Sequence, residues 1–330
     1  MQRLQRLDAF LGRHFPLFVL GFVILGLLFP EPLSWFNKIS IPLFAFITFA
    51  NSLGGGFRDL ARAFAHPLPV VAVLVILHGA MPLAALGLGT LLFPDAPLFT
   101  TGLVLEYAIP TAVVSLMWTG FAGGNIPLCL SILLLDTLLS PVVIPATLRL
   151  LLGSVVHMDS WGMMRDLMLM VAIPALLAMT LQQVTAGRVP AVWKPRLLPF
   201  SKISLLLVVM SNATGCAPFL RDLNATLALV ILAALILFVL GFLLGYGIAR
   251  LLKVPIPSLL TMSVNSGARN LSAGSVLASQ FFPPDVLFPV AFTPVFSQLI
   301  ISLVVRFLLS TPTVRAWREQ EARSAPPPGS

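Results

Sequence analysis

Long apolar runs follow one another along almost the whole chain, separated by short connections that are polar or rich in glycine and proline. A helix needs about 20 predominantly apolar residues to cross the hydrocarbon core of a bilayer. We therefore predict an all-α, polytopic membrane protein with ten transmembrane helices. The predicted spans are 15–30, 36–54, 68–93, 97–122, 126–152, 161–184, 199–217, 224–252, 256–282 and 286–310.

Two of these spans are interrupted near their middle. Pro110 lies inside span 97–122, where it removes a backbone hydrogen-bond donor and clashes with the preceding turn. Span 256–282 contains a polar stretch with two glycines around Arg269, and glycine weakens a helix. A charge near the centre of a membrane helix costs about 2.5 kcal/mol or more, so we expect Arg269 to face a partner or a water-filled cavity. Both spans are predicted to be broken helices.

Composition and charge agree with a membrane protein. The chain is 58% hydrophobic and 10% charged, with a mean hydropathy of +0.99, whereas a soluble domain carries about 25% charged residues. If the N-terminus is cytoplasmic, fifteen of the Lys and Arg residues fall on the inner side, four on the outer side, and Arg269 within a span. This asymmetry explains the net charge of +8 better than a nucleic-acid partner does, and it places both termini in the cytoplasm. We expect the tail 311–330 to be disordered.

Two similar stretches indicate an internal repeat. Residues 51–60 follow the second span and residues 211–223 follow the seventh, and both lead from Ser and Asn residues to Arg-Asp-Leu. The interrupted spans are also five apart, and because five is odd, two copies must have opposite orientations, as in many secondary transporters. We predict inverted repeats over 1–153 and 154–310. The alternative is chance similarity between apolar sequences, since a third Arg-Asp-Leu at 165–167 has no such counterpart.

Three charged side chains, Glu106, Asp136 and Arg269, lie well inside predicted spans. One interpretation is a structural ion pair in which a carboxylate neutralises Arg269. The other is a carboxylate that exchanges a proton during transport. His78, in the third span, either binds a ligand or relays protons, or it is a hydrogen-bonded packing residue.

Signatures of enzymes are absent from the sequence. It contains no phosphate-binding loop, no Cys/His metal cluster, no His-Glu-x-x-His and no Gly-x-Ser-x-Gly motif. We therefore expect no catalytic residues, no cofactor and no resident metal. Cys129 and Cys216 both fall in apolar runs, and we expect no disulfide between them.

Three stretches resemble a known family of transporters. The connection from Asn51 through Phe57 to Pro67 is similar to that family's link between helices two and three. Its fourth and fifth helices match in register at Pro110, Ser115, Thr119, Gly124, Thr137 and Pro141. Residues 267–273, followed by 281–284, are similar to its ninth helix. On these grounds the chain resembles the bacterial branch of the bile acid:sodium symporter family, which shares its broad fold with arsenite exporters and auxin efflux carriers.

The resemblance implies an architecture and a mode of action. It implies a panel domain of helices 1, 2, 6 and 7 and a core domain of helices 3–5 and 8–10, in which the unwound helices 4 and 9 cross. It also implies a substrate cleft between the two domains. Transport would proceed by alternating access as one domain moves against the other.

At several positions the chain departs from the members of this family that use sodium. In helix four, those members carry Ser-Asn, and this chain carries Ser115-Leu116. In helix five, they carry two hydroxyls, and this chain carries Cys129 and Leu133. In helix nine, they carry Glu and Gln, and this chain carries Asn265 and Arg269. Sodium prefers several oxygen ligands, leucine supplies none, and arginine adds a competing positive charge. The resemblance therefore implies degraded sodium sites, with Ser115 and Asn265 as vestiges.

These observations predict a secondary active transporter of small organic anions, bile-acid-like or carboxylate-bearing, in the bacterial inner membrane. The coupling ion would be sodium or a proton, and the protein would act as a monomer or a homo-oligomer, with no nucleic-acid partner. The alternatives are a sodium-independent facilitator or exporter, and a non-transporting membrane receptor with the same fold. The residues predicted to line the substrate and ion pathway are His78, Glu106, Pro110, Ser115, Thr119, Asp136, Thr137, Asn265, Ser266, Arg269 and Asn270.

Overall fold

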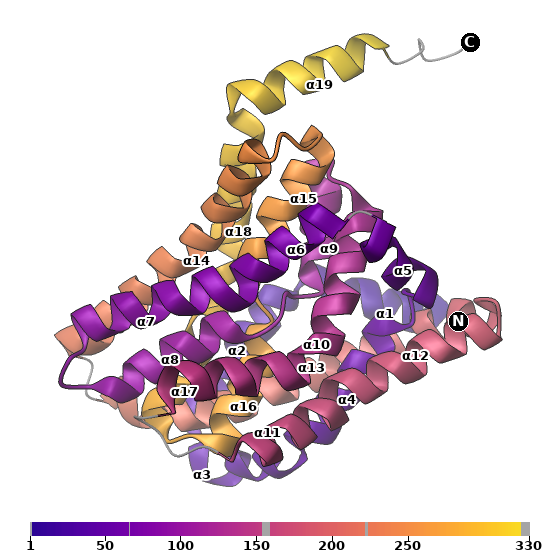
Figure 1. The fold of residues 1–330 in the computed structure, drawn as a ribbon. Coiled ribbons are helices and arrows are strands. Elements are labelled where there is room, and N and C mark those ends of the chain that lie inside the picture. Colours follow the sequence, from indigo (N-terminus) through magenta and orange to yellow (C-terminus); the bar gives the residue numbers. More distant parts are fainter. Residues whose placement is uncertain (1, 66, 154–158, 222–223, 325–330) are drawn as a thin grey trace.

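The computed structural model describes residues 2–65, 67–153, 159–221 and 224–324. Within these ranges the chain is all-helical, and its one β-type contact is an isolated bridge between two helix breaks. The all-α prediction is confirmed. Figure 1 shows long, tilted helices, with α19 projecting from one end of the molecule and α3 at the opposite end.

The first half of the chain contains α1 (Gln2–Arg13), α2 (Phe15–Leu28), α3 (Pro30–Leu33), the 3-10 helix η1 (Ser34–Ile39), α4 (Ser40–Ser52), α5 (Phe57–Ala65), α6 (Pro67–Val75), the π-helical turn η2 (Ile76–Ala80), α7 (Met81–Leu92), α8 (Pro97–Ala108), α9 (Val114–Ala122) and α10 (Ile126–Leu152). The second half contains α11 (Ser160–Leu167), the π-helical turn η3 (Met168–Ala172), α12 (Ile173–Val184), α13 (Arg188–Arg221), α14 (Ala225–Leu251), α15 (Ile256–Gly267), α16 (Leu271–Phe281), α17 (Pro284–Phe292), α18 (Pro294–Ser310) and α19 (Pro312–Ser324).

The starts of these helices follow from local chemistry. Proline stands in the first turn of many of them, including α8, α10 and α15, where its missing N–H leaves no bond unmade. Asparagine caps two of the longest helices. The side chain of Asn125 accepts a hydrogen bond from the amide of Leu128 at 3.0 Å, and that of Asn224 accepts one from the amide of Leu227 at 2.9 Å.

By length and composition, seven helices among the described residues could cross a membrane: Pro30–Ser52, Pro67–Leu92, Ile126–Leu152, Ser160–Val184, Arg188–Phe219, Ala225–Leu251 and Pro284–Ser310. The count rises to eight if Arg6–Arg13 and Leu17–Leu28, which meet at 71°, form one bent span. The predicted spans 97–122 and 256–282 are absent from this set because each consists of two shorter helices. The count of ten and the inverted relation of the two halves stay predictions, and residues 222–223 of the proposed repeat lie outside the described residues.

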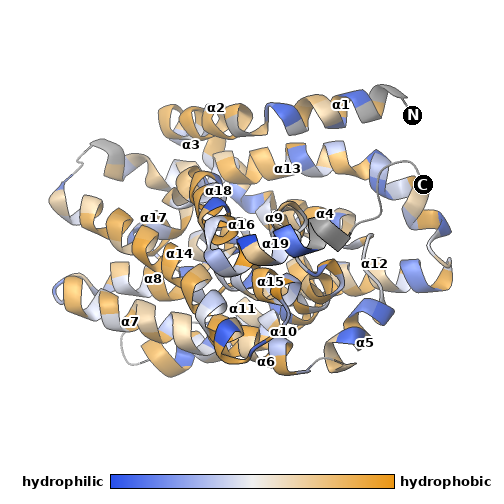
Figure 2. Ribbon diagram, turned by 90° about the horizontal axis from the view of Figure 1, so that it is seen from above, coloured by the Kyte–Doolittle hydropathy of each residue, from blue (hydrophilic) through white to orange (hydrophobic). Residues whose placement is uncertain are grey.

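The helices pack in two sets, which also contact each other through α13 and α17. In one, α13 runs along both α2 and α4, and α4 also packs on α12. In the other, α14 packs on α15, and α8 packs on both α7 and α17. Hydrophobic residues cover most of the long helices, while hydrophilic residues gather on α1, α5 and α19 (Figure 2). The division into panel and core domains stays a prediction that this grouping supports.

Part of the C-terminal tail differs from the prediction of disorder over 311–330, because Pro312–Ser324 forms helix α19, whereas residues 325–330 lie outside the described residues. The helix is anchored by Val314, which is fully buried, and by Trp317, which packs against the core. Arg318 Nη2 also donates a hydrogen bond to the carbonyl of Ala122, at 3.2 Å, where α9 ends. The composition of the tail suggested a solvated segment, whereas these three contacts fix it to the end of the bundle.

Candidate functional site

The two predicted helix breaks exist, and they meet. The chain leaves the helix over residues 109–113 between α8 and α9, and over 268–270 between α15 and α16. Thr111 and Arg269 form an antiparallel bridge between these segments. The amide of Ala112 donates to the carbonyl of Ala268, and the amide of Asn270 donates to the carbonyl of Pro110, both at 2.9 Å. We call residues 109–113 and 268–270 together the crossing.

Local sequence explains both interruptions. Ile109 is extended because the residue before a proline is disfavoured in the helical region, and Pro110 then offers only its carbonyl to the other segment. On the other side, Asn270 caps α16 through a hydrogen bond from the amide of Ala273, at 3.3 Å. The nearby Gly267 serves close packing, since a Cβ at this position would overlap the ring of Phe242 on α14.

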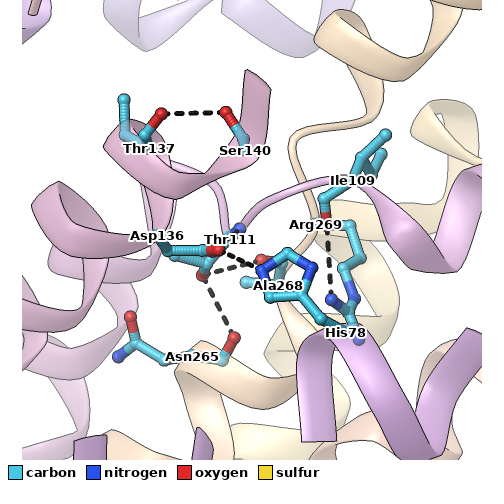
Figure 3. A network of polar contacts seen from close by, with 9 residues as sticks. All are labelled: His78, Ile109, Thr111, Asp136, Thr137, Ser140, Asn265, Ala268 and Arg269. Carbon is cyan, nitrogen blue, oxygen red and sulfur yellow. Dashed lines mark hydrogen bonds and ion pairs between the residues drawn. The ribbon is translucent and has the colours of Figure 1, made fainter. Parts of the chain in front are cut away.

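Asp136 of α10 connects the crossing to a neighbouring helix (Figure 3). Its carboxylate is fully buried, and Oδ2 accepts a hydrogen bond from the amide of Thr111 at 2.6 Å. The other oxygen, Oδ1, lies 2.6 Å from Nε2 of His78. His78 belongs to the π-helical turn η2, a distortion that occurs frequently at functional sites. One carboxylate therefore holds both the break between α8 and α9 and the histidine.

Arg269 is buried without a carboxylate partner. Its side chain leaves the crossing with Nη1 donating to the carbonyl of Ile109 at 3.3 Å, and the guanidinium lies 5.9 Å from the ring centre of Tyr107. Within the described part of the chain, its Nε and Nη2 atoms have no hydrogen-bond partner, although the residue is only 4% exposed. Neither Glu106 nor Asp136 forms a salt bridge with it among the described residues. The structural ion pair proposed from the sequence is therefore not formed at contact distance.

Glu106 of α8 is also fully buried, and neither of its carboxylate oxygens has a hydrogen-bond partner among the residues that the structure describes. Burying an ionised carboxylate that is neither paired nor hydrogen-bonded is very costly. Glu106 and Arg269 are thus two buried ionisable residues of the same region that form no salt bridge with each other among the described residues.

The positions predicted as sodium-site vestiges lie together beside the crossing. Ser115 Oγ donates to Oδ1 of Asn265 at 3.2 Å, and Nδ2 of the same amide lies 3.2 Å from the sulfur of Cys129. Thr119 Oγ1 lies 3.5 Å from that sulfur as well. These four side chains bond to one another and bring a thiol and an amide N–H₂ group where a hard cation would need oxygen ligands. The side chains of this cluster therefore do not fit a sodium ion.

The remaining predicted residues are less closely joined. Ser266 is fully buried and its hydroxyl has no partner. Thr137 follows Asp136 in α10, but the contact recorded for it is a hydrogen bond at 2.8 Å from Ser140 to its carbonyl, and it has no bond to the crossing (Figure 3). Thr111 was missed by the sequence reasoning, although its hydroxyl donates to the carbonyls of Asn265 and Ala268 at 3.1 and 3.0 Å. Its position directly after Pro110 is a signal that could have identified it.

Comparison with known proteins shows which family the chain resembles. The sequence profile described as "Sodium Bile acid symporter family" matches residues 41–223. The uncharacterized protein YbaS of Bacillus subtilis is 39% identical over 288 residues, which are 87% of this chain and 94% of YbaS. YocS of the same organism, named as an uncharacterized sodium-dependent transporter, is 26% identical over 312 residues, covering 93% of this chain and 94% of YocS. The Arabidopsis thaliana protein named probable sodium/metabolite cotransporter BASS1, chloroplastic, is 28% identical over 320 residues, covering 94% of this chain and 74% of BASS1.

These matches confirm the resemblance drawn from the sequence. The profile covers more than half of the chain, and the alignment with YbaS extends over most of both proteins. The chain belongs to the sodium bile acid symporter family.

Proposed function

We propose that the protein is a secondary transporter that carries a small organic anion across the bacterial inner membrane by alternating access, with Arg269 as the anion-recognising residue. The single observation that carries this proposal is the buried guanidinium of Arg269, with two unsatisfied nitrogen atoms, at the crossing of two broken helices. Broken helices that meet near the middle of the membrane are where secondary transporters hold their substrates.

Electrostatics favours an anion at this place. A guanidinium binds a carboxylate through two parallel hydrogen bonds, and Nε and Nη2 of Arg269 have the fork geometry that such a pair requires. The helices α9 and α16 both begin at the crossing, so the positive ends of their dipoles lie beside the same charge. An anionic substrate would thus satisfy donors that the protein itself leaves unsatisfied.

Access to Arg269 requires movement. Thr111, Asn265 and Arg269 are all buried in this conformation, so a substrate from either side cannot reach the guanidinium directly. Opening toward one side and then toward the other is the motion that alternating access describes. The proposed panel and core domains would be the two bodies that move in this way.

Sodium is not the coupling ion in this proposal. The cluster of Ser115, Thr119, Cys129 and Asn265 lacks a carboxylate and contains a sulfur atom. A sodium ion about 4 Å from Arg269 would also be repelled by about 4 kcal/mol at an effective dielectric constant of about 20. The names of YocS and BASS1 include sodium, so the proposal separates this chain from those two relatives on the chemistry of its own residues.

Transport in proteoliposomes tests the proposal. The purified full chain is reconstituted, and uptake of radiolabelled cholate, lactate and succinate is measured under a sodium gradient, under a pH gradient and without any gradient, beside protein-free liposomes. We expect protein-dependent uptake that a sodium gradient does not increase. Accumulation driven by sodium would refute the argument about the cluster, and specific binding without counterflow would identify a receptor. Equilibration without accumulation under either gradient would identify a facilitator.

A further inference from the structure

We infer that His78 and Asp136 together form the binding site of a coupling proton, which enters at Nδ1 of His78. The inference rests on the proposed anion transport and adds the residue that links transport to a proton gradient. It starts from the 2.6 Å contact between Nε2 of His78 and Oδ1 of Asp136, and from the missing hydrogen-bond partner of Nδ1.

The direction of the hydrogen bond fixes where the proton can bind. With Asp136 ionised, its oxygens only accept hydrogen bonds, and Nε2 of His78 then carries the hydrogen of their contact. The lone pair of the neutral imidazole then lies on Nδ1, which is buried and has no donor facing it. A proton taken from water on one side of the membrane forms an N–H bond at Nδ1, and its release to water on the other side restores the neutral ring.

The surroundings of His78 leave Asp136 as its direct partner. The turn η2 packs against α6, α7, α8, α10 and α14. The helices α6 and α7 contain no titratable side chain, and the titratable side chains of the other three are Glu106, Tyr107, Cys129, Asp136, Arg149, Tyr246 and Arg250. Of these, Asp136 contacts the imidazole, whereas Arg250 lies over the ring of Tyr246, 5.9 Å from its centre.

The charge balance of the crossing explains why proton and anion would travel together. With His78 and Glu106 neutral, the negative charge of Asp136 and the positive charge of Arg269 cancel. A proton on His78 then leaves one net positive charge, which a monoanionic substrate neutralises. Because an unbalanced charge is costly inside a membrane, the empty state and the doubly loaded state are favoured over either singly loaded state. If the protein changes conformation only in these two neutral states, each anion crosses the membrane together with one proton.

The same carboxylate can transmit protonation to the helix break. Oδ1 of Asp136 meets His78, while Oδ2 holds the amide of Thr111 in the segment that crosses Arg269. Conversion of the neutral imidazole to an imidazolium turns a single hydrogen bond into an ion pair on this carboxylate. The π-helical turn η2 presents His78 to Asp136 at the level of the crossing (Figure 3).

The test measures proton and anion movement in the same proteoliposomes. Wild-type protein is expected to take up one proton for each carboxylate, detected with a trapped pH-sensitive dye, and to accumulate the carboxylate under an inward proton gradient. His78→Gln is expected to abolish this accumulation and the accompanying proton uptake, and to slow carboxylate exchange between the two sides, because the anion-loaded variant keeps an unbalanced charge. The matched control is His14→Gln, because His14 lies at the start of α2 and contacts Phe10 rather than the crossing; it should behave as the wild type.

The outcomes separate this inference from the proposed function. If the wild type shows neither uptake nor exchange, anion transport itself is refuted. If it transports without proton movement, or if His78→Gln still couples protons, only the inference about His78 is overturned. Loss of coupling in Glu106→Gln together with its retention in His78→Gln would assign the proton to Glu106 instead. If His78→Gln proves inactive in exchange, its binding of cholate is compared with that of the wild type by thermal shift at acidic and neutral pH. If cholate binding by the variant depends on pH as it does in the wild type, the inference is overturned. If the variant loses this pH dependence, the inference is supported.

Discussion

Replacing Arg269 by methionine is the most direct test of anion recognition. Methionine keeps much of the length and apolar volume of the arginine stem and removes the charge. The side chain of Arg269 is 4% exposed, so the change exposes no new surface to water. The effect of the substitution on substrate affinity can therefore be separated from its effect on the free energy of folding.

The free energy of folding should change little. The variant loses one hydrogen bond to a carbonyl, that between Nη1 and Ile109, worth about 1.5–3 kcal/mol for a charged donor, and a contact with the ring of Tyr107 worth about 0.5–2 kcal/mol. The variant no longer has the desolvation cost of a buried ion, which is several kcal/mol. Because these terms oppose each other, we expect the melting temperature to stay within about 3 °C of the wild type.

Substrate affinity should fall much more. Removing one partner of a buried, hydrogen-bonded charge pair costs about 2–5 kcal/mol. At about 1.4 kcal/mol per tenfold change, this corresponds to a loss of about 30-fold to several thousandfold in affinity for a carboxylate. Arg269→Lys should show a smaller loss because it keeps the charge and loses the planar fork.

The assay is saturable carboxylate uptake in proteoliposomes, combined with thermal unfolding in detergent. The matched control is Arg306→Met, an exposed arginine in α18, which should leave KM unchanged. A KM for Arg269→Met within about threefold of the wild type would show that the buried guanidinium does not contact the substrate. An equal loss in both variants would point to a general effect of removing positive charge.

Three further predictions follow from the packing and hydrogen bonds. Asp136→Ala leaves a buried backbone amide and an imidazole without their acceptor, and it should lower the free energy of unfolding, measured by thermal unfolding, by about 2–4 kcal/mol. Asp136→Asn keeps one acceptor and should lower this free energy by less. Gly267→Ala forces a methyl group into an aromatic ring on α14 and should destabilise the protein by about 1–3 kcal/mol, while Gly247→Ala, where nothing lies within 4 Å of the added Cβ, should be neutral or slightly stabilising. The double substitution Asn265→Glu with Arg269→Gln introduces the residue types that the family resemblance implies for sodium-using members, and uptake should then rise with external sodium. No response to sodium would refute the proposal that these two positions alone determine whether sodium is used.

The helix breaks could be predicted from the sequence because their causes are local. Pro110 lacks an N–H group, and the polar run around Arg269 contrasts sharply with its apolar neighbours. The association of Ser115 with Asn265 was inferred from the family resemblance, and the two side chains are in direct contact. Signals carried by one residue or by a short motif were therefore informative.

Pairings between helices were harder to predict. His78 and Asp136 are 58 residues apart, and both lie in runs that are apolar on every face, so periodicity gives no indication of which side chains face each other. The π-helical turn that presents His78 contains Gly79 and is followed by Pro82, and the turn η3 is likewise followed by Pro174, but this local pattern does not indicate which side chain His78 faces. The sequence left open whether Arg269 pairs with a carboxylate, and the two nitrogen atoms without a partner are visible only in the three-dimensional arrangement.

The contacts that hold the crossing together have a consequence for how this family can diverge. Two of the bonds between the segments join main-chain atoms, namely the amides of Ala112 and Asn270 and the carbonyls of Ala268 and Pro110, and the side chains of Thr111 and Arg269 add to them. Main-chain bonds do not depend on which side chains the neighbouring positions carry. Residues at positions such as 265 and 269 can therefore be exchanged during evolution while the scaffold that positions them is retained. A change of driving ion then needs a few substitutions rather than a new fold.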